Sequence, residues 1–187
     1  MSIIVLSAVN EMLQSIGESP VTSLNSGLLE AAIALDLLDQ QNEKIQAIGY
    51  PFNTEKNFRL SRDIDGIIHL PDNTLKVCGP LTDNGYVKQR GHKLYNSKEQ
   101  SFTFSASVVV NLVLKIPFDE LTVTTRNYIT LKAARIFQDR TIGANDLHGY
   151  QKQDEEEARR LFLDEADTEK YNIFHGPMRY DLQRDLF

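Results

Sequence analysis

The sequence predicts an α+β fold that is mainly helical. We expect a four-helix bundle-like domain, a small antiparallel β-sheet inserted between the second and third helices, and an extended C-terminal tail. Near both ends of the chain, apolar residues recur every three or four positions, as on the buried face of a helix. The middle third instead consists of short β-prone runs separated by turn residues. We therefore expect a helical domain at residues 1–49 and 118–168, a β-insertion at 50–117 and a C-terminal arm at 169–187.

The first helix is predicted over residues 2–16. Its apolar face is formed by Leu6, Val9, Met12, Leu13 and Ile16. Gly17 is expected to end this helix, because glycine readily takes the left-handed conformation of a C-terminal cap. The second helix is predicted to begin at Asn25 or Ser26, which are favourable N-caps, and to stop at Gly49. Its first half is apolar almost all round, which predicts burial on more than one side.

The β-insertion is predicted from its β-prone runs, which lie at residues 58–60, 67–70, 75–78, 86–88, 93–95, 102–104 and 108–116. Asn84-Gly85 and Arg90-Gly91-His92 predict hairpin turns within it. In the last run, one set of alternate residues is wholly apolar, which predicts that this set faces the core. Its members are Val108, Val110, Leu112, Leu114 and Ile116.

Helical spacing returns after the β-insertion. A third helix is predicted from a cap at Asp119 to Gly143, and a fourth from Asn145 or Asp146. From about residue 169 the periodicity lapses, although the segment stays rich in apolar and aromatic residues. Such a terminus is not typical of a disordered polar tail, so we expect it to pack on its own domain or on another protein.

Composition and charge narrow the class of protein. The chain has 187 residues, which is enough to bury a hydrophobic core without disulfide bonds or metal ions to stabilise it. Twenty Lys and Arg against 26 Asp and Glu give a net charge of −6, which argues against nucleic-acid binding over the whole surface. Residues 1–49 carry −5, residues 50–118 carry +3, and residues 119–187 carry −4. The single cysteine, Cys78, excludes an intramolecular disulfide and a multi-cysteine zinc site.

The apolar start of the chain has no basic residue before it, and no apolar run approaches ~18 residues. We therefore expect neither a signal peptide nor a membrane span. The composition is compatible with a reducing cytoplasm.

The sequence shows no motif for a catalytic, cofactor-binding or metal site, and we expect none. It lacks glycine-rich phosphate loops, Gly-x-Ser-x-Gly and His-Glu-x-x-His. The histidines show no ligand spacing: His69, His92, His148 and His175. Asp63-Ile64-Asp65-Gly66 faintly resembles the start of a calcium loop, but its glycine comes too early, so we interpret it as a turn. The acidic run at residues 154–157 is interpreted as a solvated face, because consecutive helix residues point about 100° apart.

Three classes of function stay open on the residues alone. An interaction or structural protein is the default, because nothing catalytic is visible. A glycan hydrolase would need two carboxylates across a cleft, hidden among the 26 acidic residues. A DNA-contacting module could use the basic residues of the β-insertion, which we interpret first as solvated strand faces or a surface for an acidic protein partner. These residues are Lys56, Arg59, Arg62, Lys76, Lys88, Arg90, Lys93 and Lys98.

An ordered series of segments resembles the tail tubular protein A family, the adaptors of short-tailed phages. The stretch LSAVNEMLQSIGESPV, at residues 6–21, is similar to the family's opening. Gly49-Tyr50-Pro51-Phe52-Asn53 resembles the end of its second helix, and Ile68-His69-Leu70-Pro71-Asp72 resembles its Leu-Pro-Asp turn. Segments within 128–138 and 154–161 resemble its third and fourth helices, and Tyr171-Asn172-Ile173 resembles the tail beyond.

The resemblance implies a structural protein of the virion tail, assembled in the host cytoplasm, with no enzymatic activity, no cofactor and no membrane partner. It implies a ring of about twelve copies that joins the portal protein to the tail nozzle, a tail tubular protein B-like partner. The ring would line the channel through which double-stranded DNA passes, without specific binding, during genome ejection. Ala31, Ala34, Leu35 and Leu38 are then expected to pack between neighbouring copies. Tyr171, Ile173 and Phe174 are expected to anchor the C-terminal arm on the portal, because aromatic residues dominate such interfaces.

Overall fold

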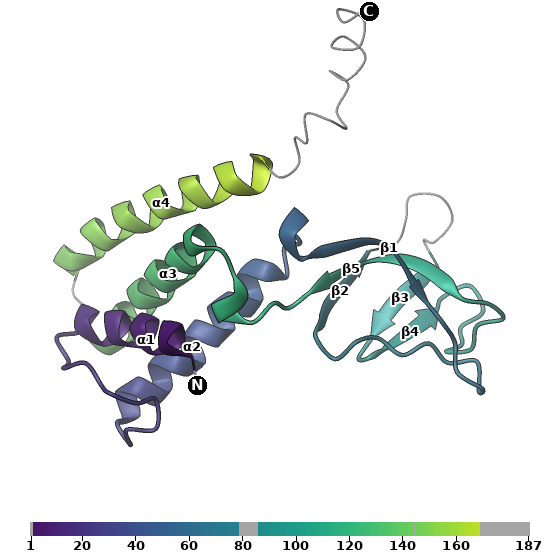
Figure 1. Cartoon of the computed structure of the whole chain (residues 1–187), viewed down its shortest axis with the longest axis horizontal. Helices are drawn as coiled ribbons and strands as arrows, with labels where there is room; N and C mark the ends of the chain where they lie inside the picture. The colour runs from purple at the N-terminus through teal and green to yellow at the C-terminus, as the bar shows by residue number, and fades with distance from the viewer. Residues whose placement is uncertain (1, 79–85, 144, 169–187) are drawn as a thin grey trace, which may run out of the picture. The chain divides into compact units, whose positions relative to one another are not determined.

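The computed structural model describes residues 2–78, 86–143 and 145–168, and it has the predicted α+β composition (Figure 1). The chain divides into two compact units. The helical unit comprises Met1–Asn42 and Phe118–Phe187, and the β unit comprises Glu43–Pro117. Within the helical unit, α1 packs against α3, and α3 packs against α4 (Figure 1). The bundle-like arrangement of all four helices stays a prediction.

Helix α1 spans Ile3–Ser15, within one residue of the predicted bounds at each end. The Ser2 hydroxyl caps its start by accepting a hydrogen bond from the Ile4 backbone N–H at 3.3 Å. Gly17 follows the helix with a φ of +81°, as predicted for its C-terminal stop. The N–H groups of Gly17 and Glu18 donate back to the carbonyls of Gln14 and Leu13, which satisfies the last turn. The buried face contains Ala8, Val9, Met12 and Leu13.

Helix α2 spans Leu29–Gln46, so the predicted start at Asn25 or Ser26 is wrong. Gly27 has a φ of +77°, which a right-handed helix cannot include, so the helix begins only after it. The prediction that its first half is buried on more than one side is also wrong for the single chain. Leu29 and Ile33 are 67% and 47% exposed, and they lie on the opposite side from the buried residues of the same helix.

The short 3-10 helix η2 spans Phe118–Glu120, and α3 follows at Val123–Thr141. The predicted cap at Asp119 is wrong, because Asp119 lies inside this 3-10 turn. The cap of α3 is Thr122, whose hydroxyl accepts from the Thr125 N–H at 3.3 Å. Helix α4 spans Asn145–Thr168 and begins where predicted.

Aromatic stacking and an ion pair join α3 to α4. The rings of Tyr128 and Phe162 stack with their centroids 5.2 Å apart. The guanidinium of Arg135, on α3, donates to the Glu155 carboxylate on α4 and to Asp139 one turn further along α3.

The β unit contains two antiparallel sheets rather than the single sheet predicted. Its three-stranded sheet has the order β1-β5-β2, with β1 at Thr54–Leu60, β5 at Val108–Leu114 and β2 at Thr74–Cys78. The second sheet is a hairpin of β3, Val87–Arg90, and β4, Lys93–Asn96. The predicted turn at Gly91-His92 joins these two strands, whereas the predicted turn at Asn84-Gly85 lies outside the described residues.

The core of the β unit contains one face of β5, as predicted. Val110 and Leu112 are fully buried there, and Val108 and Leu114 pack at its margin. Val113 points to the other face, which the prediction left exposed, yet it is only 2% exposed. The cause is Gly49, whose backbone approaches so closely that an added Cβ would lie 2.9 Å from the Val113 Cγ2.

A short 3-10 helix, η1 at Pro51–Asn53, connects α2 to β1. The buried Asn53 amide donates to the carbonyls of Gln46 at 2.9 Å and Leu114 at 3.0 Å, and its oxygen accepts from the Tyr50 N–H at 2.8 Å. This one side chain therefore joins the end of α2, the turn after it and the end of β5.

Candidate functional site

We first searched for a chemical centre in the described residues. Within them, no three His, Cys, Asp or Glu side chains gather where they could hold a metal ion. In the same part of the chain, no helix is long and apolar enough to cross a membrane. Cys78 is half-buried at the end of β2.

The segment Asp63-Ile64-Asp65-Gly66 forms a turn, as predicted. One oxygen of the Asp63 carboxylate accepts from the N–H groups of Ile67 at 2.8 Å and Asp65 at 3.0 Å. The hydrogen bond from Ile67 is the main reason that the pKa of Asp63 is lowered, with a further contribution from His69. His69 Nε2 lies 3.1 Å from the second Asp63 oxygen. These carboxylate contacts stabilise a turn.

The acidic run on α4 is only partly the solvated face that was predicted. Asp154, Glu156 and Glu157 are exposed. Glu155 is not, because it binds Arg135 and its side chain is 12% exposed. The hydrogen bond from Arg135 to Glu155 is also the main reason that the pKa of Arg135 is raised.

The two predicted assembly sites fall in different parts of the chain. Tyr171, Ile173 and Phe174 lie outside the described residues. The α2 residues proposed to meet a neighbouring copy are Ala31, Ala34, Leu35 and Leu38. Ala31, Ala34 and Leu38 are at most 2% exposed and Leu35 is half-buried, so within one chain they belong mainly to the core.

An exposed basic and aromatic surface lies on the β3–β4 hairpin. The strand register pairs Lys88 with Tyr95 and Arg90 with Lys93, which places all four side chains on one face. The opposite face is anchored, because Leu94 is fully buried in the core and the Gln89 side chain accepts from the Val77 N–H at 3.1 Å. The outer face is thus held on a rigid base.

Cation–π contacts organise this outer face. The guanidinium carbon of Arg90 lies 3.4 Å from the centroid of the Tyr95 ring, and Phe102 packs edge-on against that ring at 5.1 Å. Lys98 lies 5.5 Å from the centroid of Tyr86. Tyr86 is 52% exposed and Phe102 is 39% exposed. We call this surface the hairpin face; it comprises Tyr86, Lys88, Arg90, Lys93, Tyr95, Lys98 and Phe102.

A second exposed surface runs along α2 in the helical unit. Its exposed residues recur three or four positions apart and therefore form a single stripe. We call it the α2 stripe; it comprises Leu29, Ile33, Asp36, Asp39 and Gln40. The stripe is apolar at its N-terminal end and acidic further along. No Lys or Arg occurs in residues 1–43, which contain six Asp and Glu.

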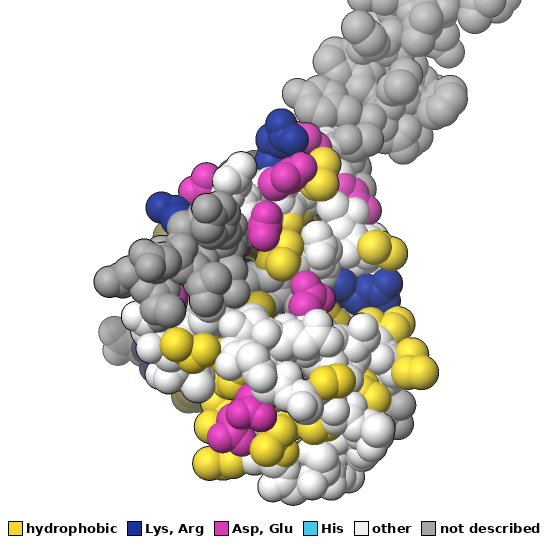
Figure 2. Space-filling model, turned by 90° about the vertical axis from the view of Figure 1, so that its left-hand side faces the viewer, with side chains coloured by type: hydrophobic (Ala, Val, Ile, Leu, Met, Phe, Trp, Pro, Cys, Tyr) yellow, Lys and Arg dark blue, Asp and Glu magenta, His cyan; other side chains and the backbone are white. Residues whose placement is uncertain are grey.

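Figure 2 shows one face of the molecule, on which apolar and acidic side chains are both exposed. In its lower part, yellow apolar side chains lie among uncharged ones, with a small magenta acidic group between them. Exposed apolar side chains next to acidic ones are typical of a surface that meets another protein.

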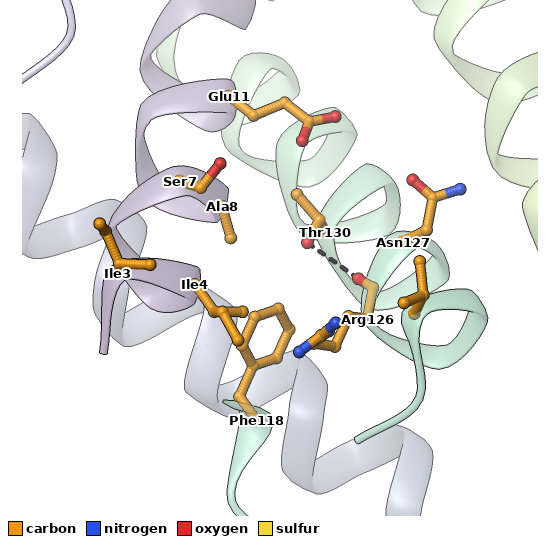
Figure 3. Close-up of a pocket in the computed structure, with 10 residues that line it drawn as sticks. Ile3, Ile4, Ser7, Ala8, Glu11, Phe118, Arg126, Asn127 and Thr130 are labelled. Atoms are coloured by element: carbon orange, nitrogen blue, oxygen red, sulfur yellow. Dashed lines mark hydrogen bonds between the residues drawn. The ribbon is translucent and has the colours of Figure 1, made fainter. Parts of the chain in front are cut away.

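An open groove of about 390 Å³ lies between α1 and α3 (Figure 3). Ile3 and Ile4 of α1, Phe118 of η2 and Arg126 of α3 surround it (Figure 3). Ile3 is 81% exposed. Two of the polar side chains here are engaged in the fold, since the Thr130 hydroxyl donates to the Arg126 carbonyl and the Arg126 guanidinium donates to the Asp119 carbonyl. Glu11 also lines the groove, and burial raises the pKa of its carboxyl.

The sequence indicated some of these surfaces and not others. The basic residues and two tyrosines of the hairpin face were visible, but Phe102 was missed because its contact with Tyr95 depends on the fold between residues 96 and 102. The α2 stripe was hidden by the apolar character of the helix. The sequence feature that indicates this stripe is the spacing of Asp36 and Gln40, which places these polar residues on the same side of the helix as Leu29 and Ile33.

Two comparisons relate the chain to known proteins. A family model described as tail tubular protein matches residues 6–171. A curated relative from Klebsiella phage KP34, named tail tubular protein A, is 30% identical over 116 residues. That match covers 62% of this chain and 61% of the relative's length.

Proposed function

The chain belongs to the tail tubular protein family, and from that premise we propose that it is the head-to-tail adaptor of a short-tailed phage. Family membership makes it a structural protein of the phage tail. We propose further that it forms a ring of about twelve copies between the portal and the nozzle. In this role it lines the DNA channel and performs no catalysis.

The observation that carries this proposal is the extent of the family match, which runs from within α1 to residue 171. The name of the Klebsiella phage relative supports it, although the match spans less than two thirds of that protein. The exposed apolar side chains of the described residues support a structural role, because such side chains can pack against another protein.

We propose that residues 169–187 dock on the portal through Tyr171, Ile173 and Phe174. Their apolar and aromatic character supports this assignment. The predicted contacts of Ala31, Ala34, Leu35 and Leu38 with a neighbouring copy stay part of the proposal. In the single chain the exposed part of the same helix is the α2 stripe, which offers the more accessible side.

A DNA-contacting role is a second candidate, and the observation that favours it is the hairpin face with its four basic side chains. Binding of that kind would weaken steeply with salt, because phosphate contacts release counterions. The net charge of −6 supports the adaptor, since DNA has to slide through a channel without sticking.

The experiment that tests the adaptor role mixes this protein with the portal ring encoded by the same genome. Native mass spectrometry and electron microscopy then give the stoichiometry and the position of the bound copies. We expect a discrete ring that caps one end of the portal. Removal of residues 169–187 should weaken this binding while the circular dichroism of the helices is retained. Failure of the intact protein to bind a folded portal ring would overturn the proposal.

A further inference from the structure

We propose that the hairpin face of one copy binds the α2 stripe of the next copy, so that these two surfaces form the side-to-side contact of the assembly. This inference rests on the proposed function for the idea of a ring. The pairing of the two surfaces comes from their charge, their exposure and their chemistry in this chain.

The first argument is charge complementarity. The hairpin face presents Lys88, Arg90 and Lys98 as exposed cations, with half-buried Lys93 beside them. Residues 1–43, which include the α2 stripe, contain six acidic residues and no basic one. The β unit as a whole has ten Lys and Arg against seven Asp and Glu. One chain therefore carries two surfaces of opposite sign, and like surfaces of two copies repel each other.

The second argument is the fixed orientation of the Arg90 guanidinium. Stacking on Tyr95 fixes the plane of the Arg90 guanidinium, which then presents its N–H groups outward at a low cost in side-chain entropy. A guanidinium held in this way is suited to bind a carboxylate through two parallel hydrogen bonds. Asp36, exposed on the α2 stripe, supplies such a carboxylate.

The same contact argues against single-stranded nucleic acid as the occupant. Binding of that kind depends on bare aromatic rings on which bases stack. In the hairpin face, Arg90 covers a face of the Tyr95 ring and Lys98 lies over Tyr86. The rings thus serve mainly to orient cations, which favours a partner that offers carboxylates.

The third argument is the apolar part of each surface. Leu29 and Ile33 are 67% and 47% exposed at the N-terminal end of the α2 stripe. Phe102 and Tyr86 are 39% and 52% exposed at the margin of the hairpin face. An interface needs apolar anchors surrounded by polar groups, and each of these two surfaces supplies both.

The two surfaces are different patches of the same chain, so their contact is head-to-tail. Repetition of such a contact closes into a ring when the rotation between copies allows it. Each copy then uses both of its surfaces, one toward each neighbour.

A pair of charge-reversed variants tests this arrangement. The first carries Lys88→Glu with Arg90→Glu, and the second carries Asp36→Lys with Gln40→Lys. In each variant alone, the substituted positions would face side chains of the same sign: positions 88 and 90 become acidic opposite Asp36 in the first, and positions 36 and 40 become basic opposite Lys88 and Arg90 in the second. In an equal mixture, copies can alternate so that positions 88 and 90 face positions 36 and 40 with opposite signs at every contact. A matched control, Lys56→Glu with Arg59→Glu, makes the same charge change on exposed residues of β1.

Association is measured by photo-crosslinking from a benzophenone side chain at Phe102, with one population isotope-labelled so that links between copies are identified by mass. In the unaltered protein at high concentration, we expect links from position 102 to α2 of another copy. Each variant alone should lose these links by on the order of tenfold or more, and the mixture and the control should keep them. Circular dichroism of every variant verifies folding.

Three outcomes would overturn the inference: no links to α2 of another copy, links only within one chain, or no recovery in the mixture of two folded variants. Loss of binding to a short DNA duplex in the Lys88 and Arg90 variant, with copy-to-copy links unchanged, would assign the hairpin face to DNA instead. Binding to the portal ring is measured separately. The adaptor role therefore stands if only the links fail, and it falls if only portal binding fails.

Discussion

The side-chain amide of Gln46 and the backbone of Ile116 exchange two hydrogen bonds across 70 positions of sequence. The amide nitrogen of Gln46 donates to the Ile116 carbonyl at 2.9 Å, and the Ile116 N–H donates to the Gln46 oxygen at 2.8 Å. Gln46 is fully buried. Asn53 adds a second set of bonds beside this pair. The amide pair and Asn53 together hold the two points at which the chain enters and leaves the β unit.

We expect Asn53→Ala to lower the free energy of unfolding by about 3 kcal/mol, because it removes three hydrogen bonds from a buried place. Urea denaturation measures this change. Asn53→Asp is the matched comparison, since it keeps the oxygen that accepts from Tyr50 and loses the two donors. An unchanged unfolding midpoint in Asn53→Ala would show that water replaces all three bonds.

Gly49→Ala should destabilise the protein by about 1–3 kcal/mol through backbone strain and overpacking. Gly49 has a φ of +88°, and its new Cβ would lie 2.9 Å from Val113. Gly91→Ala separates the two causes, because Gly91 has a φ of +60° with no atom within 4 Å of an added Cβ. We expect the Gly91 variant to lose less stability in the same urea titration. Equal losses would mean that the contact with Val113 costs nothing.

Local features of the sequence predicted much of the fold. The periodicity and bounds of α1 were confirmed, because a helix end depends on residues within one turn, such as the cap that Ser2 supplies. The start of α2 was predicted too early, although the deciding residue is equally local. Asn25 and Ser26 are good caps, but Gly27 adopts a positive φ and postpones the helix. In that segment, turn geometry prevailed over capping preference.

The pairing of strands that are distant in the sequence could not be predicted. The strands were found from their composition, but the division into β1-β5-β2 and β3-β4 depends on partners up to about 60 residues apart, for example Thr54 and Val113. The burial of Val113 depends on Gly49, which is equally remote in sequence. The hairpin face required the register of Lys88 opposite Tyr95. Periodicity along one strand does not contain that information.

Glu155→Ala should lower stability by about 2 kcal/mol, because it removes a charge-assisted bond from a half-buried Arg135. Glu156→Ala is the matched control on the exposed side of the same helix, and we expect a change within about 0.5 kcal/mol. The free energy of unfolding of both variants is measured by thermal and urea denaturation. Similar losses in the two variants would show that helix propensity rather than the ion pair is measured.

Acid should weaken the turn that Asp63 holds together. The pKa of Asp63 is lowered in the folded protein from its ordinary value of 3.8, chiefly by the hydrogen bond from the Ile67 N–H. A carboxyl with a lowered folded pKa contributes stability above its unfolded pKa and loses this contribution as pH falls through its folded pKa. The loss should therefore begin near pH 3.8 and continue below it.

Asp63→Asn provides the comparison, because it keeps an oxygen that accepts from Ile67 and Asp65 but cannot titrate. Urea midpoints of both proteins are measured from neutral pH to below pH 3.8. We expect the native protein to be the more stable at neutral pH, since its carboxylate forms charge-assisted bonds. The difference should shrink only in the acid range, because Asp63 stays ionised above it. A difference that is constant with pH would show that the turn depends on the shape of the side chain and not on its charge.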